Sequence, residues 1–556
     1  MPTVSIYDAA TQVTAGSADA DGRVVLATPT GGPDETIAPD ELWQLMNVTI
    51  PSQTGWVNAK DYGAVNDGTA CNAAAGEAAQ AAANAAAINV SNIFTAGWQP
   101  NPVSGSSIIR KYTPPVVWPP GIYRLDRPWD FTAMDGASIH WICPGAVFVR
   151  GGTEVTGNSG TWAGDAAMLI GRNISPTTVA FFIYMDQATF VNFPMSIRAG
   201  IAPNNVPQAQ YYFNRCQFIG DVDGRSIGVR IFNRSANCHF HDCNFNTCRL
   251  WLDIQSCDKT VVTVGRFKVE KRQTSTWDET LADRGSRRTY TAFTRLNYGQ
   301  LFVRDSIFIP HGANIPNNSG TQPLAWFMQQ DVQPWEPGID WIVGDVCIYD
   351  GVHYSCHTAN SDAAFNASKW QAWAFPKWVS GQYYDAGDYV NYQDVERQCI
   401  VANNDAVFDA AKWTTFWANA RSVWGTLDLQ GNHFGGEGGG IPAVINDKAP
   451  DDKTPAHLPT RINVAHNELA AYSATPHGVS GHMPAVLLRQ IPNRVQVTDN
   501  CYSQANQVAV DYHAGTTAPT PWTPNSGKTL ALKVEGNQGG SGDPNFVPAN
   551  LEPYLL

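Results

Sequence analysis

The sequence predicts an all-β protein whose main body is a solenoid, and three observations support this fold class. A short phrase recurs along the chain: an apolar residue, two residues, a small or polar residue, one residue, and a second apolar residue. The 556 residues include 48 glycines, 36 prolines and 19 tryptophans but few charged residues, a composition typical of strands joined by many turns. A tandem duplication interrupts the repeats.

The recurring phrase predicts one solenoid coil per repeat. Neighbouring phrases are separated by 27 residues (213 to 240), 35 (429 to 464), 33 (464 to 497) and 37 (497 to 534). We expect the first apolar residues to stack in one column, and the Cys or Asn at the small-or-polar position to form a ladder along the axis. Unrelated strands of a sandwich are the alternative, but they do not predict a phrase of fixed internal spacing. The column would contain Phe213, Phe240, Val303, Leu429, Val464 and Val497.

Charge and cysteine usage exclude several classes of protein. With 36 Lys and Arg against 49 Asp and Glu, the net charge of −13 argues against a nucleic-acid binder, which needs cations to neutralise phosphates. There is no apolar run of 18 residues and no signal-like start, so we expect neither membrane insertion nor secretion by a signal peptide. The eleven cysteines form no CxxC pair, which favours reduced, buried thiols over zinc ligands or disulfides. We expect no metal or cofactor.

The start of the solenoid carries a family resemblance. The stretch VNAKDYGAVNDGTACNAAA (57–75) places a Gly- and Asp-marked turn before an alanine-rich segment that predicts a helix over 73–90. Together with VVWPPGIYRL (116–125), it resembles the entry segment of the pectate-lyase-like superfamily, a pattern common in bacteriophage tailspike depolymerases. Cys71 and Asn72 depart from that pattern. The resemblance covers about residues 56–540 and implies a right-handed parallel β-helix whose open end is capped by the helix.

The duplication predicts two small inserted β modules. Residues 335–374 align without a gap to 378–417, and 15 of the 40 positions are identical. The phrase Trp-x2-Gly-Asp-x3-Tyr resembles the type-5/12 chitin- and cellulose-binding modules, in which aromatic faces stack on sugar rings. We assign Trp370 and Trp413 to the module cores. Sugar contact and core packing remain equal alternatives for Trp335, Trp341, Trp378, Tyr383 and Tyr384.

The segment CRLWLDIQS (248–256) is the candidate groove strand. In the family, the strand before each coil phrase lines the substrate groove, and alternation here would turn Leu250, Leu252 and Ile254 inward. Trp251 and Asp253 would then face outward. Because an exposed Trp has no structural benefit, its outward position indicates a substrate groove. The expected sugar-binding residues of the groove are Arg225, Arg230, Arg249 and Trp251.

Asp253 is the expected catalytic carboxylate, with a partner from Asp221, Asp223 or Glu270. Two carboxylates can hydrolyse a glycosidic bond when they lie roughly 5–9.5 Å apart. Asp221 and Asp223 could equally well only shape a turn. A lyase would instead need a base such as Lys, Arg, His or Tyr, with cations to neutralise a uronate, and the arginines keep that alternative open.

These observations predict a phage tailspike that binds and depolymerises a bacterial capsule, exopolysaccharide or O-antigen, with hydrolysis favoured over elimination. The resemblance implies a homotrimer, assembled in the host cytoplasm and carried on the virion tail. A non-catalytic receptor-binding fibre and a free polysaccharidase are the alternatives. The expected regions are a particle-attachment region (1–55), the first part of the β-helix (56–333), two carbohydrate-binding-like modules (334–418), and the last part of the β-helix with a tail (419–556).

Overall fold

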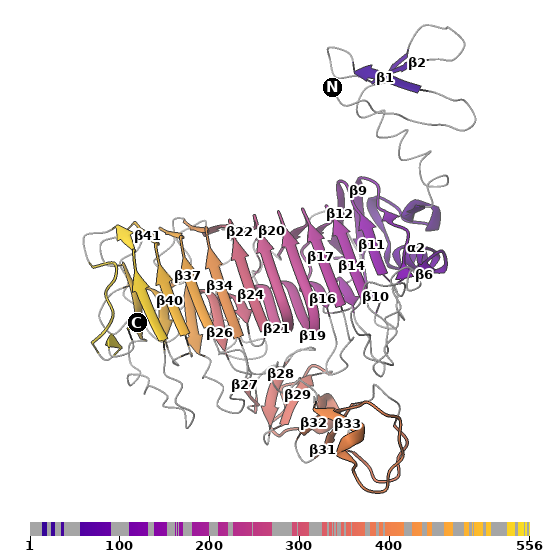
Figure 1. The fold of residues 1–556 in the computed structure, drawn as a ribbon. Coiled ribbons are helices and arrows are strands. Elements are labelled where there is room, and N and C mark those ends of the chain that lie inside the picture. Colours follow the sequence, from indigo (N-terminus) through magenta and orange to yellow (C-terminus); the bar gives the residue numbers. More distant parts are fainter. Residues whose placement is uncertain are drawn as a thin grey trace.

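Parallel strands in register form the body of the molecule, which we call the shaft (Figure 1). Apart from a few single residues and pairs, the computed structural model describes residues 14–18, 24–27, 35–37, 56–89, 111–131, 138–152, 166–170, 181–199, 209–220, 226–246, 250–269, 292–296, 299–310, 325–330, 333–335, 346–349, 352–356, 358–372, 378–384, 389–392, 395–415, 425–435, 442–447, 461–470, 483–488, 494–503, 507–512, 531–539 and 543–549. The predicted fold class, a right-handed parallel β-helix with a capping helix and inserted β modules, is confirmed.

Three walls of parallel strands surround the core of the shaft. Wall 1 contains β4 (Val57–Asn58), β8 (Val116–Val117), β11 (Ser138–Ile142), β14 (Phe181–Asp186), β17 (Ala209–Asn214), the C-terminal parts of β19 (Ile227–His241) and β21 (Leu250–Thr263), β24 (Gly299–Arg304), β34 (Gly425–Gln430), β37 (Arg461–Ala465), β40 (Arg494–Thr498) and β43 (Ala531–Glu535).

Wall 2 follows wall 1 in each coil and consists of short strands. It contains β5 (Asp67–Cys71), β9 (Gly121–Leu125), β12 (Ala146–Arg150), β15 (Thr189–Val191), β18 (Gln217–Ile219), β20 (Asn244–Asn246), β22 (Arg266–Val269), β25 (Ile307–Pro310), β35 (His433–Phe434), β38 (Glu468–Leu469), β41 (Cys501–Tyr502) and β44 (Gln538–Gly539).

Wall 3 completes the coil. It contains β10 (Trp129–Phe131), β13 (Met168–Ile170), β16 (Met195–Ala199), the N-terminal parts of β19 and β21, β23 (Ala292–Leu296), β26 (Ala325–Gln330), β36 (Val444–Asp447), β39 (Met483–Leu488) and β42 (Gln507–Tyr512). β19 and β21 each run through both walls, so these two coils turn the corner without a break in the strand.

The predicted apolar column is confirmed on the inner face of wall 1. Parallel pairing places Phe213 opposite Phe240, Val303 opposite Leu429, and Val464 between Leu429 and Val497. Val262 fills the coil between Phe240 and Val303, a repeat that the sequence phrase had missed. In wall 2 the second apolar position forms a stack of phenylalanine rings with neighbouring centroids 4.5–5.9 Å apart. The stack contains Phe148, Phe190, Phe218, Phe245, Phe267, Phe308 and Phe434.

The predicted ladder lies at the turn between walls 1 and 2. Each ladder amide donates to the backbone oxygen of a column residue in the previous coil, as Asn467 Nδ2 does to Leu429 O at 3.0 Å. The same Asn467 accepts from the backbone N–H of Asn432 at 2.9 Å, so every rung satisfies buried backbone groups of its neighbour. The thiols of Cys216 and Cys243 donate to carbonyl oxygens at the equivalent column position, and burial raises the pKa of Cys243 well above its ordinary value. The ladder continues through Asn432, Asn467, Asn500 and Asn537 to Asn545.

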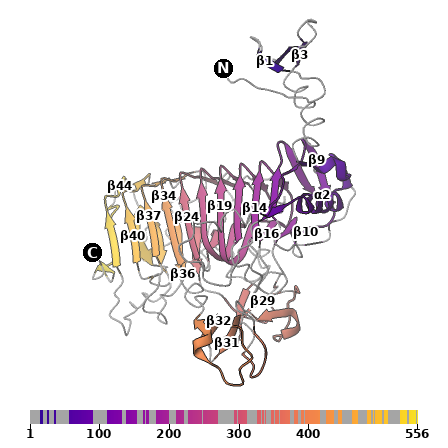
Figure 2. The ribbon, with the colours of Figure 1, turned by 45° about the vertical axis from the view of Figure 1, so that its right-hand side comes forward.

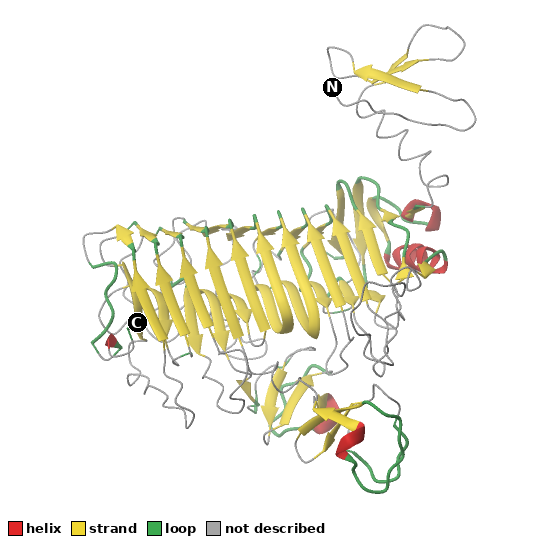
Figure 3. Cartoon of the chain, in the orientation of Figure 1, coloured by secondary structure: helices red, strands yellow, loops and turns green. Residues whose placement is uncertain are grey.

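The alanine-rich helix α2 (Ala73–Ala85) covers the N-terminal end of the shaft and is shorter than the predicted 73–90 (Figure 3). It packs on tryptophans of the first coils so closely that a Cβ at Gly76 would lie 2.3 Å from Nε1 of Trp129. Gln80 accepts from Nε1 of Trp141 at 2.8 Å and donates to the backbone of Ser138. Asn72, one of the two departures from the family pattern, holds the preceding turn by accepting from the Val65 N–H at 2.7 Å. α2 therefore hides the open apolar end.

Smaller elements complete the described residues. A three-stranded antiparallel sheet lies in the N-terminal region, and the turn η1 and a two-stranded sheet lie near α2. A mixed four-stranded sheet and a three-stranded antiparallel sheet form the modules, which project from the shaft in both views (Figure 2). The modules leave the shaft after β26 and the chain returns at β34, which pairs in register with β24. No helix among the described residues is both long and apolar enough to cross a membrane. These elements are β1 (Thr14–Ala18), β2 (Val24–Ala27), β3 (Glu35–Ile37), η1 (Ala59–Tyr62), β6 (Ile88–Asn89), β7 (Lys111–Tyr112), β27 (Gln333–Pro334), β28 (Val346–Tyr349), β29 (Val352–Cys356), η4 (Ala367–Lys369), β30 (Trp370–Ala372), β31 (Tyr389–Tyr392), β32 (Val395–Cys399), η5 (Ala410–Lys412) and β33 (Trp413–Thr415).

Candidate functional site

Asp253 lies in a buried ion cluster on wall 3. Register places it between Arg230 of the previous coil and Arg295 of the next. Its Oδ2 accepts from Arg230 Nε and Arg295 Nη2, each at 2.7 Å, and its Oδ1 accepts from Arg295 Nε at 2.8 Å. Arg198 stands opposite Arg230 in the coil before, so three arginines and one aspartate share this column. The predicted proximity of Asp253 and Arg230 is confirmed.

The burial of this cluster limits its chemistry. The side chains of Asp253 and Arg230 have no exposed surface, and that of Arg295 has almost none. Asp253 was predicted to lie in an open groove, and this prediction of an exposed side chain is wrong. Both carboxylate oxygens are occupied by guanidinium donors. The geometry suits a group that fixes the positions of two arginines better than one that donates a proton to a sugar.

The predicted outward orientation of Trp251 is also wrong. Its indole lies in the core, with ring centroids 5.0 Å from Phe267 and 5.8 Å from Trp326. Register places it opposite Gly228, where a Cβ would lie 2.5 Å from the Trp251 carbonyl oxygen and 3.0 Å from the Phe245 ring. Leu250, expected to face the core, belongs instead to a separate apolar cluster with Met195 and Ile227. Strict alternation of inward and outward side chains therefore fails at the N-terminal end of β21.

The remaining residues predicted for the groove cannot be placed. Asp221, Asp223, Arg225, Arg249 and Glu270 lie outside the described residues. Within the described part of the chain, no group of three or more His, Cys, Asp or Glu side chains could hold a metal ion.

The outer face of wall 1 carries a strip of side chains that the sequence analysis missed. Pairing of successive coils aligns His140 with Tyr184, Tyr184 with Tyr212, and Tyr212 with His239. Tyr184 and Tyr212 are 40% and 37% exposed, whereas the outward residues of the Asp253 column are buried. We call this row the wall 1 strip: His140, Tyr184, Tyr212, His239, Val261, Phe302, Asp428, Asn463, Gln496 and Lys533.

The aromatic rings of the strip contact their neighbours in two ways. The planes of Tyr212 and His239 are stacked at 4.8 Å and 9°, so each covers one face of the other. His140 meets Tyr184 edge-on at 5.0 Å. A stack along the axis leaves hydroxyl and ring-nitrogen edges to contact a ligand, which suits hydrogen bonds to sugar hydroxyls. Burial and the charge of Lys259 lower the pKa of His239, and burial lowers the pKa of His140 against the opposing effect of Asp186.

Charged groups border the aromatic part of the strip. Asp186, two residues after Tyr184 on β14, accepts from Asn214 Nδ2 at 2.7 Å and pairs with Arg215 at 2.9 Å. Lys259 and Arg304 both lie over the ring of Phe302, at 5.4 and 5.7 Å from its centroid. Cations therefore stand beside the aromatic rings on both sides.

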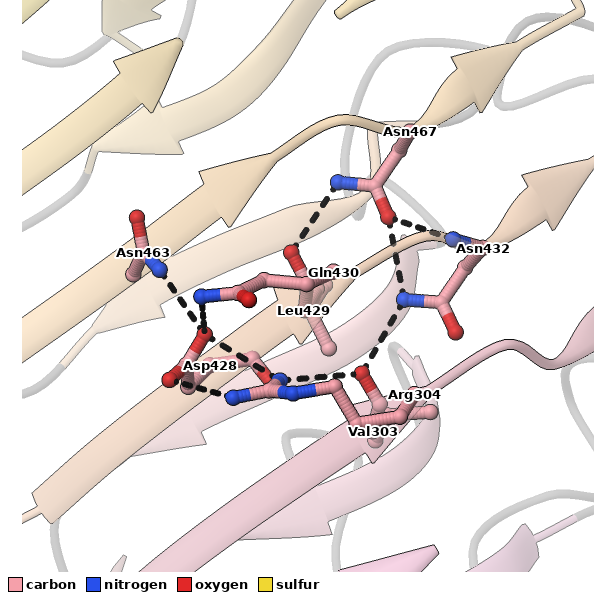
Figure 4. A network of polar contacts seen from close by, with 8 residues as sticks. All are labelled: Val303, Arg304, Asp428, Leu429, Gln430, Asn432, Asn463 and Asn467. Carbon is pink, nitrogen blue, oxygen red and sulfur yellow. Dashed lines mark hydrogen bonds and ion pairs between the residues drawn. The ribbon is translucent and has the colours of Figure 1, made fainter. Parts of the chain in front are cut away.

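A polar network fills the C-terminal half of the strip (Figure 4). Arg304 Nη2 pairs with Asp428 Oδ2 at 2.8 Å, and Asp428 Oδ1 accepts from Asn463 Nδ2 at 2.8 Å and Gln430 Nε2 at 3.1 Å. The outer face of wall 1 thus changes along the axis from aromatic to hydrogen-bonding groups.

A sequence signal for the strip existed. Each strip residue stands immediately before the first apolar residue of its coil phrase, as Tyr212 precedes Phe213 and His239 precedes Phe240. The substrate groove was predicted on the strand before each coil phrase, whereas the strip lies on the strand that contains the phrase.

Most aromatic residues at equivalent positions of the two modules lie in the module cores. Trp341 and Tyr384 are only 2% and 4% exposed, and they pack edge-on against Trp370 and Trp413, respectively. The core assignment of Trp370 and Trp413 is confirmed. Partly buried Trp335 and Trp378 pack against the same cores, which leaves Tyr383, 62% exposed, as the predicted sugar-contact residue with an open side chain.

Comparisons with solved structures extend over most of the chain at low identity. The surface adhesin PfbA of Streptococcus pneumoniae matches with a TM-score of 0.33 and 9% identity, covering 87% of this chain and 89% of its own. The tailspike of Escherichia coli bacteriophage HK620, in complex with a pentasaccharide, matches with a TM-score of 0.34 and 9% identity over 90% and 73%. An α-1,3-glucanase from Streptomyces thermodiastaticus matches with a TM-score of 0.30 and 10% identity over 90% and 71%.

At these TM-scores the likenesses say nothing about activity, and the fold rests on the strand pairing itself. No protein-family model matches the chain, and no curated protein sequence matches it.

Proposed function

We propose that this protein is a tailspike-type depolymerase that binds a bacterial surface polysaccharide along the wall 1 strip and cleaves it. The exposed row of Tyr184, Tyr212 and the neighbouring histidines carries this proposal. Wall 1 has twelve strands, and at about 4.8 Å per coil its outer face is roughly 50 Å long. A straight, open face of this length suits an extended polymer better than a small molecule, which binds in a closed pocket.

The cleavage step that we propose is hydrolysis of the glycosidic bond. For hydrolysis, the carboxylates remain Asp253 with Asp221, Asp223 or Glu270. The two guanidinium groups on Asp253 favour a different division of roles, in which Asp253 positions arginines and another carboxylate acts on the sugar. A fibre that binds glycan without cleaving it remains the alternative from another class.

One observation favours elimination as a second candidate reaction. His239 lies on the exposed strip, and its lowered pKa keeps the imidazole neutral and able to accept a proton at neutral pH. Lys259 lies on the same outer face, and Arg215, in the turn after β17, pairs with Asp186 beside the strip. Both cations could neutralise the carboxylate of a uronate, which makes its neighbouring proton easier to remove.

Incubation with purified surface polysaccharides from a panel of bacteria tests the proposal. The wild-type protein should shorten at least one polymer, measured by size-exclusion chromatography, and an absorbing unsaturated uronate among the products would identify elimination. Tyr212→Ala should weaken binding about tenfold or more. Gln217→Ala, on the outer face of wall 2, is the matched control and should bind as the wild type does. Equal binding by Tyr212→Ala would overturn the placement of the glycan on wall 1.

The assembly is part of the same proposal. We place the protein on a virion tail as a homotrimer, attached through residues 1–55. Sedimentation of the purified chain tests the trimer: a mass of three chains supports it, and a stable monomer contradicts it.

A further inference from the structure

Two arginines lie side by side on the outer face of wall 1. Arg461 begins β37 and Arg494 begins β40, and register places them directly opposite each other in consecutive coils. Both side chains are exposed, whereas the residues that follow them, Ile462 and Val495, belong to the core. Two cations are therefore presented to solvent from strands that are only about 4.8 Å apart.

Neither arginine forms an ion pair with a carboxylate of the described residues. The nearby described carboxylates on the same face already have cationic partners. Asp428 pairs with Arg304 at 2.8 Å, and Glu535 pairs with Lys533. Like charges in neighbouring strands repel each other, and within the described part of the chain no anion offsets this repulsion.

The column that contains the two arginines carries no negative charge, although the whole chain has a net charge of −13. Arg494 Nη2 lies 3.5 Å from Oε1 of Gln496, so the amide nitrogen of Gln496 is a further donor beside the guanidinium groups. Such a local excess of cations attracts an anion. From the middle of wall 1 onward the column consists of Lys259, Gln300, Thr426, Arg461, Arg494 and Ala531.

The arrangement of the donors distinguishes between possible anions. On this face a single guanidinium group binds both oxygens of a carboxylate, as Arg304 Nη1 and Nη2 do with Asp428 at 3.2 and 2.8 Å. Asp253 binds two arginines because it lies between them, with one in each neighbouring coil. Arg461 and Arg494 instead lie in consecutive coils with no residue between them. Two adjacent guanidinium groups suit a phosphate, which has three free oxygens and up to two negative charges.

We propose that Arg461 and Arg494 bind a phosphate ester carried by the polysaccharide. Each arginine lies two residues before a residue of the wall 1 strip, Asn463 or Gln496. A polymer that follows the strip from Tyr212 reaches them after five coils, which is about 24 Å. The proposal rests on the proposed function for the source of the phosphate, because it names a substituent of the polymer on wall 1.

Labelled dextrans of one length test the site without the natural polymer. The full-length wild type should bind phosphorylated dextran at least about tenfold more tightly than carboxymethyl-dextran of equal charge density, measured by fluorescence anisotropy. Arg461→Gln and Arg494→Gln should each remove most of this preference. Arg266→Gln is the matched control, because it removes an exposed arginine from the outer face of wall 2 and should leave the preference unchanged.

Removal of phosphate from the natural polymer tests the source. Hydrofluoric acid cleaves phosphate esters, so treatment of the polysaccharide that the protein shortens should weaken its binding to the wild type about tenfold and have little effect on its binding to Arg494→Gln. Equal binding of the treated and untreated polymer by the wild type would overturn the polysaccharide as the source of the phosphate.

Two further results would overturn the inference. Equal binding of the two dextrans by the wild type would show that the arginines do not select phosphate. An equal loss in Arg266→Gln and Arg461→Gln would show that only the total charge matters. Either result, with a panel polysaccharide still shortened, would leave the proposed function intact. Selective binding of phosphorylated dextran by a protein that shortens no polysaccharide would support the site and contradict the proposed cleavage.

Discussion

Asp253 and Arg230 lie opposite each other in neighbouring coils of wall 3 and form an ion pair of 2.7 Å in which neither side chain is exposed. Arg295 of the next coil binds the same carboxylate. One buried carboxylate thus pairs with two buried guanidinium groups. Removing one partner of a buried pair costs more than the pair itself contributes, because the remaining charge stays desolvated.

We therefore expect Asp253→Asn to destabilise the shaft by about 3–5 kcal/mol, through the loss of the charge that neutralises Arg230 and Arg295. Guanidinium denaturation measures this loss. Asp428→Asn is the matched control, because its pair with Arg304 is partly exposed and should contribute no more than about 1 kcal/mol. An Asp253→Asn variant as stable as the wild type, but inactive in cleavage, would restore the catalytic assignment.

The asparagine ladder should be a second sensitive element. Asn467→Ala removes the acceptor of the Asn432 N–H and the donor to Leu429 O, both buried. We expect a loss of at least about 2 kcal/mol in the free energy of unfolding, since each orphaned buried group costs roughly 1–3 kcal/mol. Asn463→Ala, on the outer face of the same strand, should cost less. Equal effects of the two substitutions would show that the ladder has no special role.

A strained turn residue offers a stabilising substitution. Val264 has φ +54°, although β-branched residues are disfavoured in the left-handed region, whereas Gly431 occupies the same turn position in another coil with φ +67°. Val264→Gly should raise stability by about 0.5–1 kcal/mol, and Gly431→Val should lower it by about 1–2 kcal/mol. Thermal unfolding compares the two. A loss of stability in Val264→Gly would contradict strain at this turn.

His239 of the wall 1 strip should make the free energy of unfolding depend on pH. The folded state lowers the pKa of His239 below its ordinary value of 6.5, so the unfolded chain binds its proton first as the pH falls. Its contribution is therefore complete above about pH 6.5 and decreases as the pH falls toward the folded pKa. His239→Gln should flatten the stability profile below pH 6.5, and Asn237→Ser on the same strand should not. An unchanged profile in His239→Gln would contradict this coupling.

The periodic features of the fold could be predicted from the sequence. The column through Phe213 and Leu429, the ladder at Asn467 and the module cores around Trp370 and Trp413 all repeat a residue type at a fixed spacing. Each of these residues has an equivalent one coil or one module away, so a pattern in the sequence is enough to find them.

The features that the sequence did not reveal occupy fixed structural positions, but the residue type at those positions differs from coil to coil. The left-handed residue before the ladder position is Gln187, Arg215, Asp242, Val264, Asp305, His466 or Asp499 in some coils and Gly431 or Gly536 in others. The backbone of Trp251 approaches Gly228 so closely that a Cβ there would lie 2.5 Å from its carbonyl oxygen, a relation between residues 23 positions apart. Tyr184 and Tyr212 lie on one line only through the register of coils with unequal lengths.

A structure of the protein bound to an oligosaccharide from the polymer it shortens tests the central proposal most directly. We predict sugar density along the outer face of wall 1, within hydrogen-bonding distance of Tyr184, Tyr212 and His239, with the chain parallel to the shaft. Sugar bound only to wall 2 or to the modules, with the wall 1 strip unoccupied, would contradict it.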